Sequence, residues 1–148
     1  MSKFIYRMQS ILNLKYKMEE QARMEFAAAR MRLDEEEEKL TVLLSRRNAY
    51  EEEGRKLRER NLNVQDILDN KNAILQMDDF IVSQQARVAG AEKELEKARQ
   101  TLQEAMQERK VQEKLKEKAF DSFLLEENRR ESKEVDERTS YTYGRKRR

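Results

Sequence analysis

The chain has 148 residues, of which 42% are Asp, Glu, Lys or Arg and 37% are hydrophobic. This composition excludes a thick globular core and leaves two classes of structure, a disordered chain or long helices that bury a narrow apolar stripe. The 32 basic and 30 acidic residues give a formal net charge of +2, so the chain lacks the strong positive field of a dedicated nucleic-acid-binding protein.

Several residue types that carry chemistry are missing. The sequence has no Cys and no His, which excludes disulfides, the usual zinc sites and acid-base catalysis by histidine. Its three glycines lie too far apart to form a phosphate-binding loop. We therefore predict no catalytic residue, no metal and no cofactor. No stretch approaches the roughly 18 apolar residues of a membrane-spanning helix, so we expect a cytosolic protein without membrane insertion.

The first half of the chain predicts a helix over residues 3–58. Proline is absent and strong helix formers fill most positions. Apolar or small residues recur at alternating spacings of three and four, which predicts the seam of a coiled coil through Phe26, Ala29, Leu33, Leu40, Leu43, Tyr50, Gly54 and Leu57. Upstream, the same reasoning assigns Met8, Ile11, Met18 and Ala22 to the seam, with Lys15 interrupting and two successive steps of four from Met18 to Phe26.

Asn and Asp residues concentrate between the two halves of the chain. Their side chains compete for backbone hydrogen bonds and so favour a turn. We place the turn at residues 59–66, with the reversal itself at residues 60–64.

The second half predicts a longer helix over residues 67–140. Consecutive heptads pair Ile67 with Asn70, Ile74 with Met77, Ile81 with Gln84, Val88 with Ala91, Leu95 with Ala98 and Leu102 with Ala105. Beyond Met106 the apolar stripe is expected to shift to Val111, Leu115, Ala119 and Phe123. Helix signals weaken towards a basic tail, residues 141–148, which we expect to fray.

Reversal at the turn predicts one domain over residues 1–148, an all-α fold in which two long helices form an antiparallel coiled-coil hairpin. Phe4 is then roughly opposite Phe120, and Leu43 roughly opposite Ile81. Residues after Phe120 have no opposing helix, so another subunit is the natural cover for the apolar residues Phe120, Phe123, Leu124, Leu125 and Val135.

Three other features have two interpretations. The acidic run from Asp34 to Glu38 is a solvated helix face or, less simply, a carboxylate cluster for metal. Near the turn, large side chains either anchor a partner or pack locally; these are Tyr50, Met77 and Phe80. The terminal cluster Arg145 to Arg148 is a solubilising tail or a contact for an acidic protein, lipid or nucleic acid.

Parts of the sequence resemble a known family. The segment from Phe4 to Leu12, the chain length and the turn position are similar to the flagellar export protein FliJ, the coiled-coil component of the bacterial flagellar type III export apparatus. The C-terminal stretches point to the same family: Glu113 to Lys116, Leu124 to Arg129, and Val135 to Glu137.

The resemblance implies a fold similar to the γ-subunit coiled coil of rotary ATPases. It implies a non-enzymatic protein that binds the hexameric export ATPase, promotes assembly of that ring and couples ATP hydrolysis to export. It also implies contacts with the membrane protein of the export gate and with export chaperones, at the cytoplasmic face of the cell membrane at the flagellar base. By position, the gate-contacting patch falls at Leu43, Arg46, Tyr50, Met77 and Phe80. The ring-facing end falls at Phe123, Leu124, Glu127, Asn128, Arg129, Val135 and Asp136.

Three alternatives stay open. One is the equivalent stalk protein of a virulence type III secretion system, which would share the fold. Another is a parallel homodimeric coiled coil, in which the Asn-rich centre is a local irregularity and not a turn. The third is a nucleic-acid-binding protein that uses the arginine tail.

Overall fold

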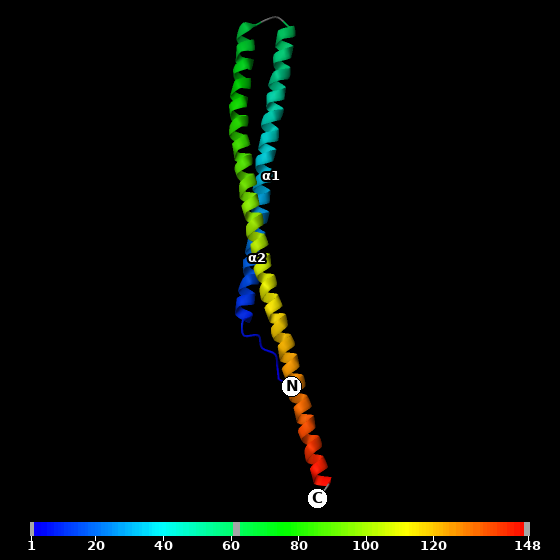
Figure 1. Ribbon diagram of the computed structural model, residues 1–148. Helices are drawn as coiled ribbons and strands as arrows, with labels where there is room; N and C mark the ends of the chain where they lie inside the picture. The colour runs from blue at the N-terminus through cyan, green and yellow to red at the C-terminus, as the bar shows by residue number, and fades with distance from the viewer. Residues whose placement is uncertain (1, 61–62, 147–148) are drawn as a thin grey trace. The chain divides into compact units, whose positions relative to one another are not determined.

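Two α-helices make up the computed structural model, which describes residues 2–60 and 63–146, with the side chains of 145 and 146 excepted. Helix α1 spans Gln9–Glu59 and helix α2 spans Val64–Lys146 (Figure 1). No strand occurs within the described ranges. The predicted all-α fold of two long helices is confirmed.

The helix ends differ from prediction at the termini of the chain. Helix α1 begins at Gln9 and not near residue 3, because residues 2–8 form a non-helical segment. Helix α2 continues to Lys146, beyond the predicted end near residue 140, whereas the fraying of the basic tail, residues 141–148, stays a prediction. Residues 147–148 lie outside the described residues.

The reversal falls inside the predicted turn. The last turn of α1 holds Lys56 and Arg58, whose positive charges favour the negative end of a helix dipole. Asn63 then caps α2, since its side-chain oxygen accepts a hydrogen bond of 3.1 Å from the backbone N–H of Gln65. Asp66 adds a negative charge to the first turn of α2. Asn61 and Leu62, which also belong to the predicted turn, lie outside the described residues.

The chain divides into two compact units. The terminal unit comprises Met1–Glu20 and Glu104–Arg148, and the hairpin unit comprises Gln21–Gln103. Each unit contains a segment of α1 and a segment of α2. The single domain expected from the sequence stays a prediction.

Contacts between the helices of the hairpin unit establish an antiparallel pair. Asn70 bonds to Tyr50, and Gln84 bonds to Glu36, so two heptads forward along α2 correspond to two heptads back along α1. The predicted seam of this unit is confirmed on both helices, because every predicted seam residue from Phe26 to Leu102 is buried or half-buried. The apolar pattern on α1 had left two seam positions unassigned, and the half-buried polar residues Glu36 and Arg47 occupy them.

The seam of the terminal unit differs from prediction. Leu12, Lys15 and Glu19 of α1 face α2 and continue the spacing of three and four, so the proposed double step of four is wrong. The residues assigned there on α1, Met8, Ile11 and Met18, are 42%, 37% and 43% exposed. On α2 the seam continues without a shift through Ala105, Arg109, Gln112, Lys116, Ala119 and Phe123. The prediction was right for Ala119 and Phe123 and wrong for Val111 and Leu115, which are exposed.

Paired charges explain why polar side chains occupy this seam. Lys15 donates to Glu108 at 3.0 Å, and Arg109 forms an ion pair with Glu19. A charge that is taken out of water is tolerated when a partner and hydrogen bonds replace the lost hydration. Apolar periodicity alone therefore assigned the wrong face of α1 here and misplaced Val111 and Leu115 on α2.

The N-terminal segment packs on α2 within the terminal unit. The ring of Phe4 lies 5.2 Å from the ring of Phe120 and 5.4 Å from that of Phe123, measured between ring centroids. These are ordinary separations for packed aromatic pairs. The predicted opposition of Phe4 and Phe120 is confirmed. The C-terminal part of α2 continues without an opposing helix (Figure 1). Every side chain from 128 to 144 is exposed.

Candidate partner-binding surfaces

The five residues of the predicted gate-contacting patch lie in the hairpin unit but face different surroundings. Leu43 and Arg46 line one groove of about 520 Å³ together with the buried Gln84. The exposed Val42 supplies further apolar lining, and the charged residues are Glu35, Glu38 and Lys39. The lining of this groove therefore combines two apolar side chains with charges of both signs.

The other three residues of that patch divide between the seam and the surface. Tyr50 and Met77 are half-buried in the seam, where both pack locally, and contact of either residue with a partner stays a prediction. Phe80 is 48% exposed and presents an aromatic ring to solvent. The structure thus brings Leu43 and Arg46 together in one groove and leaves Phe80 as the exposed aromatic residue of the set.

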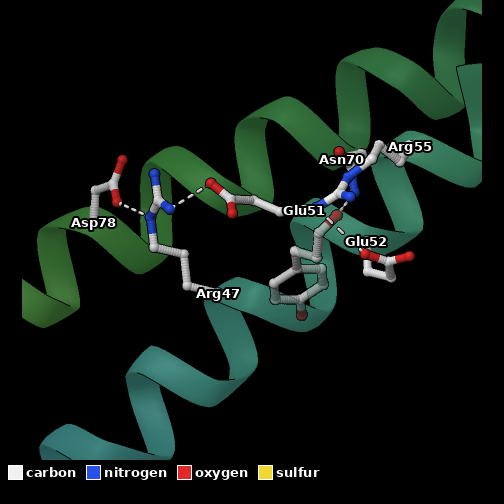
Figure 2. A network of polar contacts seen from close by, with 7 residues as sticks. Arg47, Glu51, Glu52, Arg55, Asn70 and Asp78 are labelled. Carbon is white, nitrogen blue, oxygen red and sulfur yellow. Dashed lines mark hydrogen bonds and ion pairs between the residues drawn. The ribbon is translucent and has the colours of Figure 1, made fainter.

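An ion-pair network fixes the two helices beside these residues. Figure 2 shows Arg47 reaching from α1 to Asp78 on α2 and also bonding to Glu51 one turn further along α1. The hydrogen bond to Asp78 is the main reason that the pKa of the Arg47 guanidinium is raised, and Glu51 adds to it. Arg47 therefore stays charged and holds α1 against α2 at one position along the seam.

A buried amide provides a second fixed point in the seam (Figure 2). The side-chain N–H of Asn70 donates to the backbone carbonyl of Tyr50 at 2.8 Å. Gly54, on the facing helix, leaves room for this amide, because a Cβ at Gly54 would collide with the Asn70 Oδ1 atom. Asn70 was predicted to lie in the seam, whereas its dependence on a glycine one turn beyond Tyr50 was not foreseen.

Gln84 makes the corresponding contact two heptads away. Its amide donates to the backbone carbonyl of Glu36 at 2.9 Å and also bonds to the Glu36 carboxylate. Glu36 belongs to the acidic run, and the rest of that run, Asp34, Glu35, Glu37 and Glu38, is exposed. The run is a solvated face with one member turned into the seam. Within residues 2–60 and 63–146, no group of three or more His, Cys, Asp or Glu side chains is placed to hold a metal ion.

The predicted ring-facing end lies on the part of α2 that has no opposing helix. Phe123 is half-buried against Phe4, whereas Leu124 is 43% and Val135 is 59% exposed. Glu127 is half-buried and forms an ion pair of 3.7 Å with Arg130. The remaining residues of the set are exposed: Asn128, Arg129 and Asp136. This end combines exposed apolar side chains with charges of both signs on one helix.

A second polar cluster in the terminal unit was missed from the sequence. Tyr16 donates a hydrogen bond of 2.6 Å to the Glu113 carboxylate, which also accepts one of 3.1 Å from Arg109. Arg109 in turn pairs with Glu19, and this hydrogen bond is the main reason that its pKa is raised. The signal that would have found Glu19 is its spacing, because it lies one heptad before the seam residue Phe26.

In the described part of the chain, neither helix combines the length and the apolar character that crossing a membrane requires.

Comparisons with known proteins identify the family to which the chain belongs. The family model described as the flagellar FliJ protein matches residues 3–148. Among solved structures, a proposed YscO homolog, CT670 from Chlamydia trachomatis, is similar with a TM-score of 0.78 and 26% sequence identity. That similarity covers 95% of this chain and 96% of the other. The comparison with curated proteins returned no significant match. Because the family model spans nearly every residue, the chain belongs to the flagellar FliJ protein family.

Proposed function

We propose that this chain is a non-enzymatic, stalk-like component of the flagellar type III protein export apparatus. It binds the hexameric export ATPase, promotes assembly of the ring and couples ATP hydrolysis to export. The observation that carries the proposal is the match of the FliJ family model over residues 3–148, and membership of that family supports a coiled-coil component of a type III export apparatus. The two-helix fold agrees with such a role.

The ATPase ring is proposed to bind the end of α2. Leu124 and Val135 are large apolar side chains that no other helix covers within the terminal unit, and burying them against a partner would be favourable. Arg129 and Asp136 offer charges that could orient that contact. A single helix that carries apolar residues suits insertion into a groove or ring of another protein.

The export gate is proposed to contact the hairpin unit, through the groove lined by Leu43 and Arg46 and through the exposed ring of Phe80. Tyr50 and Met77 support this surface from within the seam. Export chaperones are further proposed partners, and the protein is proposed to associate peripherally with the cytoplasmic face of the cell membrane at the flagellar base.

The test of ring binding is a reconstitution with the purified flagellar export ATPase of the same organism. The double variant Leu124→Asp/Val135→Asp places two charges on the exposed apolar surface. We expect at least about a tenfold loss of ATPase stimulation and of ring assembly, since an unpaired charge is costly to bury in an interface.

The matched control is Met31→Asp/Val82→Asp, which introduces the same two charges at exposed apolar side chains of the hairpin unit. Met31 is 64% exposed and Val82 is 65% exposed. This control should leave stimulation unchanged, and circular dichroism should show full helicity in both proteins. If the Leu124→Asp/Val135→Asp protein stimulated the ATPase as well as the control, the end of α2 would not be the coupling element.

The likeness to a proposed YscO homolog keeps a second candidate, the equivalent stalk protein of a virulence type III secretion system. Complementation distinguishes the two. Restored swimming in a flagellar deletion strain favours the first function, and restored secretion in a virulence-system deletion strain favours the second.

A further inference from the structure

The terminal unit carries an exposed apolar patch outside its seam. We call it the outer patch; it comprises Ile11, Leu14 and Met18 of α1 and Val111 and Leu115 of α2. These side chains are 37%, 54%, 43%, 56% and 44% exposed, in the same order. Spacings of three and four place each set on one face of its helix.

Both sets lie along the same side of the helix pair. Ile11 directly precedes the seam residue Leu12, and Leu115 directly precedes the seam residue Lys116. In the hairpin unit the residues in the equivalent positions, Arg32 and Glu94, form an ion pair across the helices. Three heptads separate Arg32 from Ile11, and three heptads separate Glu94 from Leu115. Ile11 and Leu115 therefore lie on the same side of the helix pair as each other, as Arg32 and Glu94 do.

A contact within the terminal unit supports this placement. Lys15, which lies between Ile11 and Met18 on α1, donates to Glu108 at 3.0 Å. Glu108 lies one heptad before Leu115 and therefore on the same edge of α2. The apolar residues of the two helices consequently lie along the same side of the helix pair.

In the terminal unit, the distribution of polar and apolar residues is the reverse of that in an ordinary coiled coil, where apolar residues fill the seam. Charged side chains occupy the seam, as Glu19 and Arg109 do, while large apolar side chains face outward. The Oε1 atom of Gln112 is even buried without a hydrogen-bond partner in the described part of the chain. Such a seam stabilises the isolated pair less than an apolar one would. Binding of another molecule to the outer face would account for the apolar residues that lie there.

Lysines flank the outer patch on both sides. Lys17 follows Leu14 by three residues on α1, and Lys114 follows Val111 by three residues on α2. Lys118 extends the row of Val111 by one heptad. All three side chains are exposed, and none forms an ion pair with any residue that the structure describes. Their unpaired positive charges would complement carboxylates on both edges of a bound segment.

The dimensions favour a helix as the occupant. Five side chains that are each about half exposed offer a few hundred Å² of apolar surface, below the about 800 Å² that each partner of a stable complex usually buries. A second copy of the chain would therefore be held weakly. A single helix needs less area and fits the depression between two parallel or antiparallel helices, where it completes a three-helix bundle.

We propose that the outer patch binds an amphipathic helix of a partner protein, whose apolar stripe is flanked on both sides by Asp or Glu. This inference goes beyond the proposed function, because the outer patch shares no residue with the proposed gate-contacting and ring-facing surfaces.

The test measures binding of two designed peptides to the full chain by fluorescence anisotropy. Both are amphipathic helices about three heptads long with a leucine stripe, one flanked by Glu and the other by Lys. The Glu-flanked peptide should bind at least about tenfold more tightly than the Lys-flanked peptide, and its affinity should fall as salt rises. The double variant Leu14→Gln/Val111→Gln should weaken binding about tenfold, while the control Met31→Gln/Val82→Gln should not.

Four results would overturn the proposal. Equal binding of the two peptides would remove the role of the lysines. Equal binding by the Leu14→Gln/Val111→Gln protein and its control would place the contact elsewhere. A much lower melting temperature of Leu14→Gln/Val111→Gln than of the control would mean that these side chains belong to the core. Sedimentation that shows a dimer which the same substitutions abolish would make a second copy the occupant.

Discussion

Asn70 lies against Gly54 where the two helices of the hairpin unit pack, with no room for a Cβ atom at that glycine, and this leads to a prediction about a single methyl group. Gly54→Ala adds a Cβ that meets the Asn70 Oδ1 atom, so the hydrogen bond to Tyr50 must distort or the helices must separate. We expect a loss of about 1–3 kcal/mol in the free energy of unfolding, measured by thermal and urea denaturation.

Gly90 provides the control, since a Cβ there meets nothing within 4 Å. Gly90→Ala should stabilise the protein by about 0.5–1 kcal/mol, the usual gain when alanine replaces glycine in a helix. Equal effects of the two substitutions would show that the space beside Asn70 is not restricted.

Tyr16 makes a prediction about pH. The hydrogen bond to Glu113 is the main reason that the pKa of the Tyr16 phenol is raised above its ordinary value of 10.0. The neutral phenol is the donor, so its contribution to stability is complete below the ordinary pKa and is lost as pH rises through the raised pKa. An ultraviolet titration of the five tyrosines should show one that ionises late, and Tyr16→Phe should remove that step. Loss of an early step instead would contradict the bond.

At the scale of the helices, the sequence predicted the hairpin unit better than the terminal unit. In the hairpin unit, apolar residues from Ile67 to Leu102 occupy the positions that heptad spacing requires, so pattern and packing agree. In the terminal unit the apolar residues lie beside the seam, and charged residues such as Lys15 and Glu19 occupy it. A method that scores only apolar character follows the wrong face. Extending the seven-residue spacing from Phe26 and Ala105 through polar positions gives the correct one.

The buried pair in that seam makes a prediction at the same scale. Glu19→Ala leaves the Arg109 guanidinium, whose side chain is 18% exposed, without its principal partner and should lower the melting temperature. The double variant Glu19→Leu/Arg109→Leu removes both charges and supplies apolar seam residues. It should melt higher than either single leucine variant and at least as high as the parent protein. Additive losses in this thermal double-mutant cycle would show that the two charges do not interact.

The candidate binding surfaces were predicted only in part. The exposure of the part of α2 that has no opposing helix could be predicted from the pairing of the two helices. No residue of α1 remains to face Leu124 or Val135. Near the turn, the spacing placed Tyr50 in the seam and left Phe80 outside it, and the burial of the two side chains agrees. The spacing does not say whether an exposed side chain such as Phe80 contacts a partner. Which partner contacts each surface is a property of two molecules and stays a prediction.

At the scale of the whole molecule, the hairpin requires that α1 meets α2 of the same chain. The sequence has no Cys, so Arg32→Cys/Glu94→Cys introduces the only two thiols at positions that form an ion pair across the helices. A short bismaleimide should link them within one chain and leave a single band at monomer mass on a denaturing gel. A parallel homodimer would instead give covalent dimers, and it would give them with the Arg32→Cys variant alone.

Two side-chain amides are bonded to backbone carbonyls of the facing helix in the hairpin unit, Asn70 to Tyr50 and Gln84 to Glu36. A slide of one helix past the other by a single turn, about 5.4 Å, would break both bonds at once. One-turn ratcheting of packed helices is a known way for proteins to transmit a signal. The loss of both bonds disfavours such a slide in this pair, so we expect mechanical displacement to occur here as bending or rigid-body rotation of the two helices together.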